Sequence, residues 1–87
     1  MALIREGLET DLPQVLDLIK ELALYENAAD QVSTTVTQMA KDGFGKDPIF
    51  GFFVVEERSR VIGMALYYWR YSTWKGKILH LEDLVVS

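Results

Sequence analysis

The hydrophobic positions between residues 11 and 25 recur every three or four residues. That spacing places them on one side of an α-helix and predicts a helix over 11–25. Thr10 and Asp11 stand where the helix should begin, and Pro13 falls in its first turn, where its missing N–H costs nothing. The apolar face of this helix consists of Leu12, Val15, Leu16, Ile19, Leu22 and Ala23.

Two shorter elements flank this helix. Residues 2–6 predict a short strand before it, and a second helix is expected at about 36–42. Thr35 and Gln38 have the spacing of a capping box at the start of the second helix. Gly43 is placed to end that helix in a left-handed turn.

From residue 49 onward, long apolar runs replace the helical spacing. Residues 49–57 form a nearly continuous apolar run, which is typical of a strand covered on both faces. Residues 61–71 and 78–86 predict two further strands, separated by short polar connections. The sequence therefore predicts a single α+β domain over 1–87, with one strand, two helices and a three-stranded antiparallel meander.

Composition narrows the classes of function. The chain is 49% hydrophobic, which favours a packed core, and its net charge is −4. Residues 1–47 hold nine acids against four bases, a balance that argues against nucleic acid and membrane surfaces as partners. No cysteine is available for a disulfide or a thiolate metal site, and no targeting or membrane-spanning run is present. We expect a cytoplasmic protein with a cationic small-molecule partner.

Glu82 and Asp83 stand side by side in an otherwise apolar strand, where burying them would cost several kcal/mol. One reading is that the strand end is wetted by solvent. The other is a carboxylate pair at the mouth of a pocket, with a raised pKa suited to proton transfer. Strict alternation predicts one face made of Leu79, Leu81, Asp83 and Val85, and an opposite face made of Ile78, His80, Glu82, Leu84 and Val86.

His80 is the only histidine of the chain, and without cysteine or a second histidine it does not indicate a metal site. The second half also carries a cluster of aromatic residues. These could form a wall of a substrate site that contacts a cation, or belong simply to the core and the sheet surface. The cluster comprises Tyr67, Tyr68, Trp69, Tyr71 and Trp74.

Four segments of the chain form a recognisable set: "LIKELALYE" (18–26), "KDGFGKDP" (41–48), "VIGMALYYWRYSTWKGK" (61–77) and "LHLEDLVV" (79–86). In this order and at these separations, they resemble the N-terminal half of the GNAT acetyltransferases, and within them the spermidine/spermine (diamine) N-acetyltransferase group. The resemblance spans nearly the whole chain and implies the acyl-CoA N-acyltransferase fold.

The resemblance implies acetyl transfer from acetyl-CoA to a primary amine, without a metal. Glu82 would be the general base, and Glu26 and Asp83 would hold the cationic substrate, with Trp74 as a further contact. The main-chain N–H groups of Leu84, Val85 and Val86 would bind the pantetheine arm and polarise the thioester carbonyl. A diamine, a polyamine and a lysine analogue all fit these acids.

The family's pyrophosphate loop, R/Q-x-x-G-x-G/A, is absent from the sequence, as is its C-terminal tyrosine acid. We therefore expect 1–87 to be a partial GNAT domain that transfers little or no acetyl group alone, which leaves its status as an enzyme open. The 77–86 strand would expose an unpaired edge, so we also expect a homodimer through it. The alternative function is a non-catalytic remnant that self-associates or binds a partner.

Overall fold

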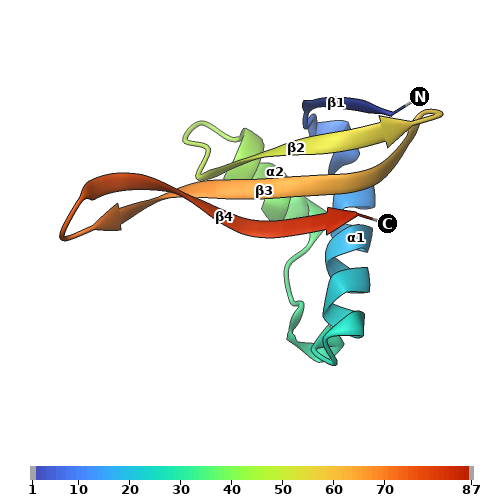
Figure 1. Ribbon diagram of the computed structural model, residues 1–87, viewed down its shortest axis with the longest axis horizontal. Helices are drawn as coiled ribbons and strands as arrows, with labels where there is room; N and C mark the ends of the chain where they lie inside the picture. Colours follow the sequence, from blue (N-terminus) through green and yellow to red (C-terminus); the bar gives the residue numbers. More distant parts are fainter. Residues whose placement is uncertain (1, 87) are drawn as a thin grey trace.

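A computed structural model describes residues 2–86. The element order confirms the predicted α+β fold, with a four-stranded antiparallel sheet in the order β1-β2-β3-β4 (Figure 1). Two 3₁₀ turns, η1 (Glu9–Asp11) and η2 (Ala29–Gln31), flank the first helix. The helices and strands are β1 (Leu3–Glu6), α1 (Leu12–Tyr25), α2 (Val36–Phe44), β2 (Phe50–Glu57), β3 (Arg60–Ser72) and β4 (Gly76–Val86).

Both helices lie on the same face of the sheet. The predicted apolar face of α1 packs across β3 and β4, and α2 packs against β2. Leu12, Val15 and Val54 have no exposed surface, so the core is centred where the first half of α1 meets the middle strands. The other buried apolar residues are Leu16, Leu18, Met39, Phe52, Val61, Met64, Leu66 and Val85.

The opposite face of the sheet is open in the described part of the chain. Phe53 points to this face, packs its ring on Tyr67 at 5.8 Å between centroids, and is 41% exposed. The apolar run at 49–57 predicted cover on both faces of its strand, and among residues 2–86 only the helical face of β2 is covered. A continuous apolar run shows that the side chains prefer burial. It does not show whether another element covers them.

The second helix begins as predicted and ends differently. The Thr35 hydroxyl accepts a hydrogen bond from the Gln38 backbone N–H at 3.1 Å, which confirms one half of the predicted capping box. The Gln38 side-chain amide donates to the Asp42 carboxylate instead of closing the box. The left-handed turn predicted at Gly43 is wrong, because Gly43 lies inside α2. Its role is close packing: a Cβ at this position would lie 2.6 Å from the Phe50 ring. The glycine lets the helix approach β2.

β2 and β3 are joined by a two-residue turn with an unusual backbone. Arg58 and Ser59 both have positive φ, 52° and 63°, which is the geometry of the type I′ turn that matches the twist of a hairpin. Asn and Gly adopt this conformation more easily than Arg and Ser. The hairpin is therefore held by pairing along β2 and β3 against a mild local preference.

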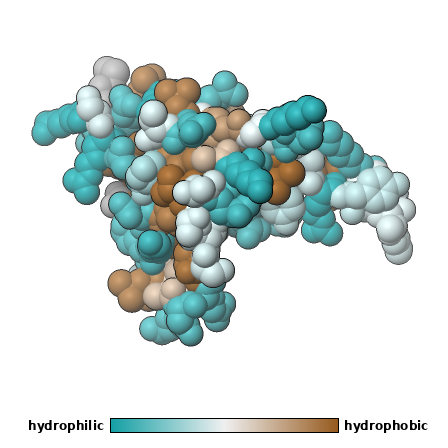
Figure 2. Space-filling model, turned by 180° about the vertical axis from the view of Figure 1, so that it is seen from behind, coloured by the Kyte–Doolittle hydropathy of each residue, from teal (hydrophilic) through white to brown (hydrophobic). Residues whose placement is uncertain are grey.

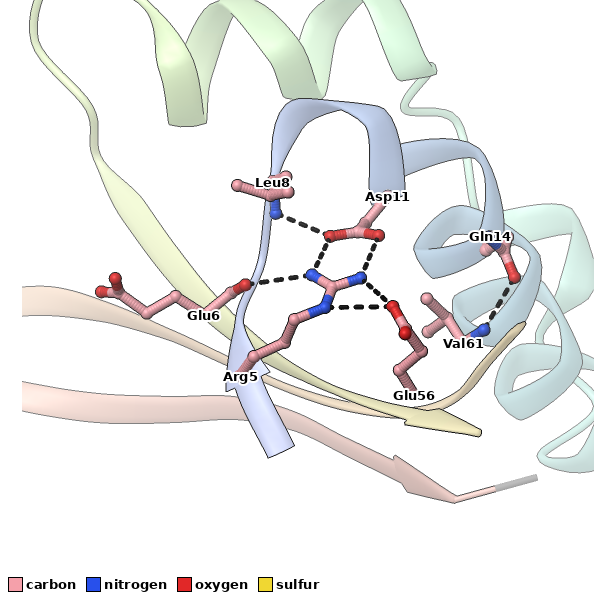
Figure 3. A network of polar contacts seen from close by, with 7 residues as sticks. All are labelled: Arg5, Glu6, Leu8, Asp11, Gln14, Glu56 and Val61. Carbon is pink, nitrogen blue, oxygen red and sulfur yellow. Dashed lines mark hydrogen bonds and ion pairs between the residues drawn. The ribbon is translucent and has the colours of Figure 1, made fainter. Parts of the chain in front are cut away.

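A polar network ties β1, η1 and β2 together at the start of the chain (Figure 3). The Arg5 guanidinium donates two hydrogen bonds to the Asp11 carboxylate, at 2.8 and 3.0 Å, and two to Glu56 Oε1, at 2.7 and 3.1 Å. Asp11 also accepts from the Leu8 N–H at 2.7 Å and is 5% exposed. Hydrogen bonds from Arg5 lower the pKa of Asp11. The same bonds tie β1 to the turn that leads into α1.

Arg5→Met should destabilise the fold by about 1–3 kcal/mol, because it leaves the nearly buried Asp11 carboxylate without its main donors. Urea unfolding measures the change. Arg70→Met is the matched control, since Arg70 is exposed and makes no ion pair within residues 2–86. The pKa of Asp11 is lowered in the fold, so its stabilisation is present above the unfolded pKa and disappears as pH falls through the folded one. Equal unfolding midpoints for the two variants would contradict this role.

Candidate functional site

A β-bulge in β4 shapes the site. Leu66 of β3 pairs with Asp83 and the next residue, Tyr67, pairs with Leu81, so Glu82 has no partner across the strands. Such a bulge inserts one extra residue, bends the strand and re-aims its side chains. The bulge is located at the adjacent acids Glu82 and Asp83.

The bulge makes the predicted face assignment of β4 wrong. Asp83 and Val85 lie opposite Leu66 and Met64 on the helical face, and His80 lies on this same face opposite Tyr68. Strict alternation put His80 and Asp83 on opposite faces, but the extra residue at 82 shifts the alternation by one. Leu79, Leu81, Leu84 and Val86 lie on the open face and are each more than half exposed.

The end of α1 and the bulge bring three acids to one cavity. Glu26 directly follows the last residue of α1, and Glu82 and Asp83 come from the bulge of β4. The cavity has a volume of about 290 Å³ and is open to solvent. Its lining is completed by Ile19, Leu22, Ala23, Ala28, Gln31 and Val32. The structure thus places together the three acidic residues singled out from the sequence.

Asp83 is the acid that burial affects most. Its pKa is raised, first by burial and then by the neighbouring charges of Glu82 and Glu26. No hydrogen bond or ion pair of Asp83 is found within residues 2–86 to offset this. A half-buried carboxylate flanked by two like charges attracts a cation, which would relieve both the desolvation and the repulsion.

Glu82 also faces a second, aromatic cavity of about 380 Å³. It is lined by Phe50, Tyr68 and Trp69 together with Ile49 and Leu66. His80 stacks on Tyr68 at 5.0 Å between ring centroids, and its Nε2 lies 3.9 Å from Glu82 Oε1. Glu82 therefore joins an acidic cavity to an aromatic one. Strand alternation had already placed His80 and Glu82 on one face, and what sequence reasoning missed is the stacking of His80 on Tyr68 of the neighbouring strand.

The predicted aromatic cluster is divided by the two faces of the sheet. Tyr68 lines the cavity beside Glu82 on the helical face, whereas Tyr67 packs on Phe53 on the open face and Trp69 pairs with Leu79 of that same open face. Trp74 is 94% exposed in the turn between β3 and β4, at the end of a ribbon that projects beyond the helices (Figure 1). It does not line the acidic cavity within the described residues. Its contact with a substrate stays a prediction.

A third hollow of about 560 Å³ lies between the second half of α1 and the end of β4. Leu84, Val85 and Val86 form one wall, and Leu22, Leu24 and Tyr25 form the other with Glu21. β4 is an outer strand of the sheet in the described chain, so one side of its backbone faces no other strand. The three residues predicted to bind acetyl-CoA through their N–H groups therefore border an apolar groove.

No group of three or more His, Cys, Asp or Glu residues within residues 2–86 is arranged to hold a metal ion. No helix in this range has the length and apolar character needed to cross a membrane.

Comparison with known proteins supports the resemblance. The chain is 42% identical over 93 residues to a thialysine N-epsilon-acetyltransferase of Bos taurus, a match that covers 98% of this chain and 55% of that enzyme. It is 38% identical over 91 residues to the spermidine/spermine N(1)-acetyltransferase-like protein 1 of Homo sapiens, covering 97% of this chain and 13% of that protein. The chain is related to the GNAT diamine acetyltransferases.

Solved structures show the same fold. A possible acetyltransferase of Clostridium difficile 630 superposes with a TM-score of 0.70 at 18% identity, over 100% of this chain and 58% of that one. An aminoglycoside acetyltransferase from a soil metagenomic sample gives 0.70 at 18% identity, over 99% and 56%. No family model matches the chain. The chain thus has the GNAT fold and spans about half the length of the thialysine enzyme.

Asp83→Asn should raise the midpoint of thermal unfolding at neutral pH by a few degrees. The raised pKa means that the charged form opposes folding above that pKa, and this cost disappears as pH falls and the folded chain takes up the proton. The advantage of the variant should therefore shrink in acid. Asp47→Asn, at an exposed position, is the control. The same midpoint for both variants at neutral pH would exclude a strained Asp83.

Proposed function

We propose that these residues form the amine-binding side of an N-acetyltransferase site, which transfers an acetyl group from acetyl-CoA to a primary amine. The observation that carries the proposal is the convergence of Glu26, Glu82 and Asp83 on one open cavity. The relationship to the thialysine and spermidine/spermine proteins supports it. Acids from the end of a helix and from a bulged strand are costly to bring together without a cationic ligand.

Glu82 is the proposed general base. A primary amine is protonated at neutral pH and must lose a proton before its nitrogen lone pair can attack a carbonyl carbon. Glu82 lies where the acidic and aromatic cavities meet, and its side chain is 53% exposed, so it reaches solvent water. It accepts the proton through such a water, and the nearby His80 imidazole offers a route for that proton to solvent.

Asp83 and Glu26 are the proposed cation-binding residues. A diamine, a polyamine or a lysine-like amino acid carries a second positive charge, and this charge would lie against the two carboxylates. The half-buried Asp83 gains most, because the cation offsets the burial and the charge repulsion that together raise its pKa. The names of the related proteins, thialysine and spermidine/spermine acetyltransferases, agree with this class of substrate.

The groove beside the end of β4 fits the acetyl-CoA arm. Its apolar walls, Leu24 and Leu84 among them, suit the alkyl parts of a pantetheine chain, and the outer edge of β4 offers backbone groups for its amides. When bound, acetyl-CoA supplies an activated thioester. The chain's contribution would be to hold that arm at Leu84, Val85 and Val86, immediately after the acids that hold the amine.

Amine binding can be tested by calorimetric titration of spermidine into the 87-residue chain. We expect saturable binding that the double variant Glu26→Gln/Asp83→Asn weakens at least about tenfold, because two of the facing charges are lost. Glu57→Gln changes an exposed acid at the other end of the sheet and should leave the affinity unchanged. Equal affinity of the double variant and the wild-type chain would place the amine elsewhere.

Transfer is tested separately, by mass-spectrometric detection of acetylated spermidine formed in the presence of acetyl-CoA. The rate is expected to be low, because the pyrophosphate motif is absent from the sequence. Glu82→Gln should lower it further by about 10²–10⁴, the usual contribution of a general base, while Glu57→Gln should not. Product formed at the same rate by Glu82→Gln would remove this residue from the mechanism.

A further inference from the structure

The turn that ends α1 contains a left-handed residue, Asn27, with a φ of 58°. The Ala28 N–H donates to the Ala23 carbonyl at 2.7 Å, and the Asn27 N–H donates to the Leu24 carbonyl at 3.1 Å. These two hydrogen bonds define a Schellman motif, in which one residue after the helix adopts positive φ and turns the chain away from the helix axis. Glu26 is the last residue before that turn.

The same turn builds one side of the acidic cavity. Four residues of the cavity lining come from the segment 26–32, with Glu26 before Asn27 and the other three after it, and the acids of β4 also line the cavity. A helical residue at position 27 would continue α1 and carry 28–32 away along the helix axis. The left-handed conformation instead turns the chain back toward α2 (Figure 1).

We propose that Asn27 is a positioning residue of the amine site: its left-handed backbone holds Glu26 at the acids of β4 and so favours amines that carry a second positive charge. This inference rests on the proposed function. Glu82 and Asp83 are neighbours in one strand, whereas Glu26 comes from the end of a helix. An acid from a separate element can pair with a second ammonium group while the strand acids hold the first.

The placement of Glu26 is unfavourable for the fold by itself. A carboxylate at the C-terminal end of a helix lies at the negative end of the helix dipole. Its charge also contributes to the repulsion that, after burial, raises the pKa of Asp83. A cation lying between Glu26 and Asp83 offsets both costs, so the turn at Asn27 serves the cavity better than it serves the helix.

Asparagine suits this position for a conformational reason. Apart from glycine, Asn and Asp are the residues that adopt positive φ most readily, and a β-branched residue there is a genuine outlier. The Asn27 side chain is exposed. Figure 2 shows hydrophilic atoms gathered at the lower end of the molecule, where α1 ends in Figure 1. A substitution at Asn27 therefore changes the turn without opening the core.

Two amines of equal carbon length isolate the role of the second charge. Putrescine carries an ammonium group at each end, and butylamine carries one. NMR titration of each amine into the isotope-labelled 87-residue chain gives their dissociation constants. We expect Asn27→Val to weaken putrescine binding at least about fivefold and to leave butylamine binding unchanged, because the displaced Glu26 no longer faces the second charge. Asn27→Gly keeps the left-handed turn and should retain the wild-type values.

Ser59→Val is the matched control. Ser59 also has positive φ, 63°, but lies in the exposed turn between β2 and β3 and does not line the cavity. It should leave both affinities unchanged. Glu26→Gln should weaken putrescine binding as much as Asn27→Val, and the double variant should lose no more, because both changes act through one carboxylate. Additive losses, or wild-type putrescine affinity in Asn27→Val, would overturn the positioning role.

A stability measurement decides the positioning role even if neither amine binds, an outcome that would refute the proposed function alone. Asp83→Asn removes a charge that Glu26 repels, so its gain in unfolding midpoint should be smaller in the Asn27→Val background than in the Asn27→Gly background. Asn27→Ala, a milder change, replaces Asn27→Val if circular dichroism shows that the valine variant is unfolded. Equal gains in the two backgrounds would mean that residue 27 does not position Glu26.

Discussion

The packing of α1 across β3 and β4 is the contact on which the rest of this structure depends. Leu12 and Val15 at its start are fully buried against the sheet, and Arg5 with Asp11 sets the direction in which the helix leaves β1. With its first half anchored, the second half crosses behind β4 and extends beyond it (Figure 1). That extension brings Glu26 to the acids of β4 and leaves Leu24 and Tyr25 beside its free edge.

The bulge at Glu82 converts an ordinary edge strand into a candidate site. By inserting one residue it keeps Asp83 and Val85 on the helical face and turns Glu82 toward two cavities. The arrangement is unfavourable to the fold, since burial and like charges raise the pKa of Asp83. Charge clusters that destabilise a fold are typical of functional sites, where a bound ligand of opposite charge neutralises them. The ligand proposed here is a cationic amine, which agrees with the names of the related proteins.

One strand therefore carries two different surfaces. Its helical face and bulge hold the acids, and its outer edge borders an apolar groove beside the second half of α1. The proposed amine site and the proposed acetyl-CoA site therefore meet on one strand, between Glu82 and Val86.

The local elements of this protein follow from its sequence alone. The helical spacing from Leu12 to Ala23 predicted α1, the Thr35 cap predicted the start of α2, and the apolar runs predicted the meander, because period and capping are properties of neighbouring residues. Glu82 and Asp83 were also evident from the sequence, as adjacent acids in an apolar strand, and Glu26 was named through the family resemblance. Tertiary structure alone decided that Gly43 serves close packing against Phe50 and that a bulge shifts the faces of β4. Both depend on contacts between elements far apart in the chain, where cross-strand register and ring packing outweigh local preference.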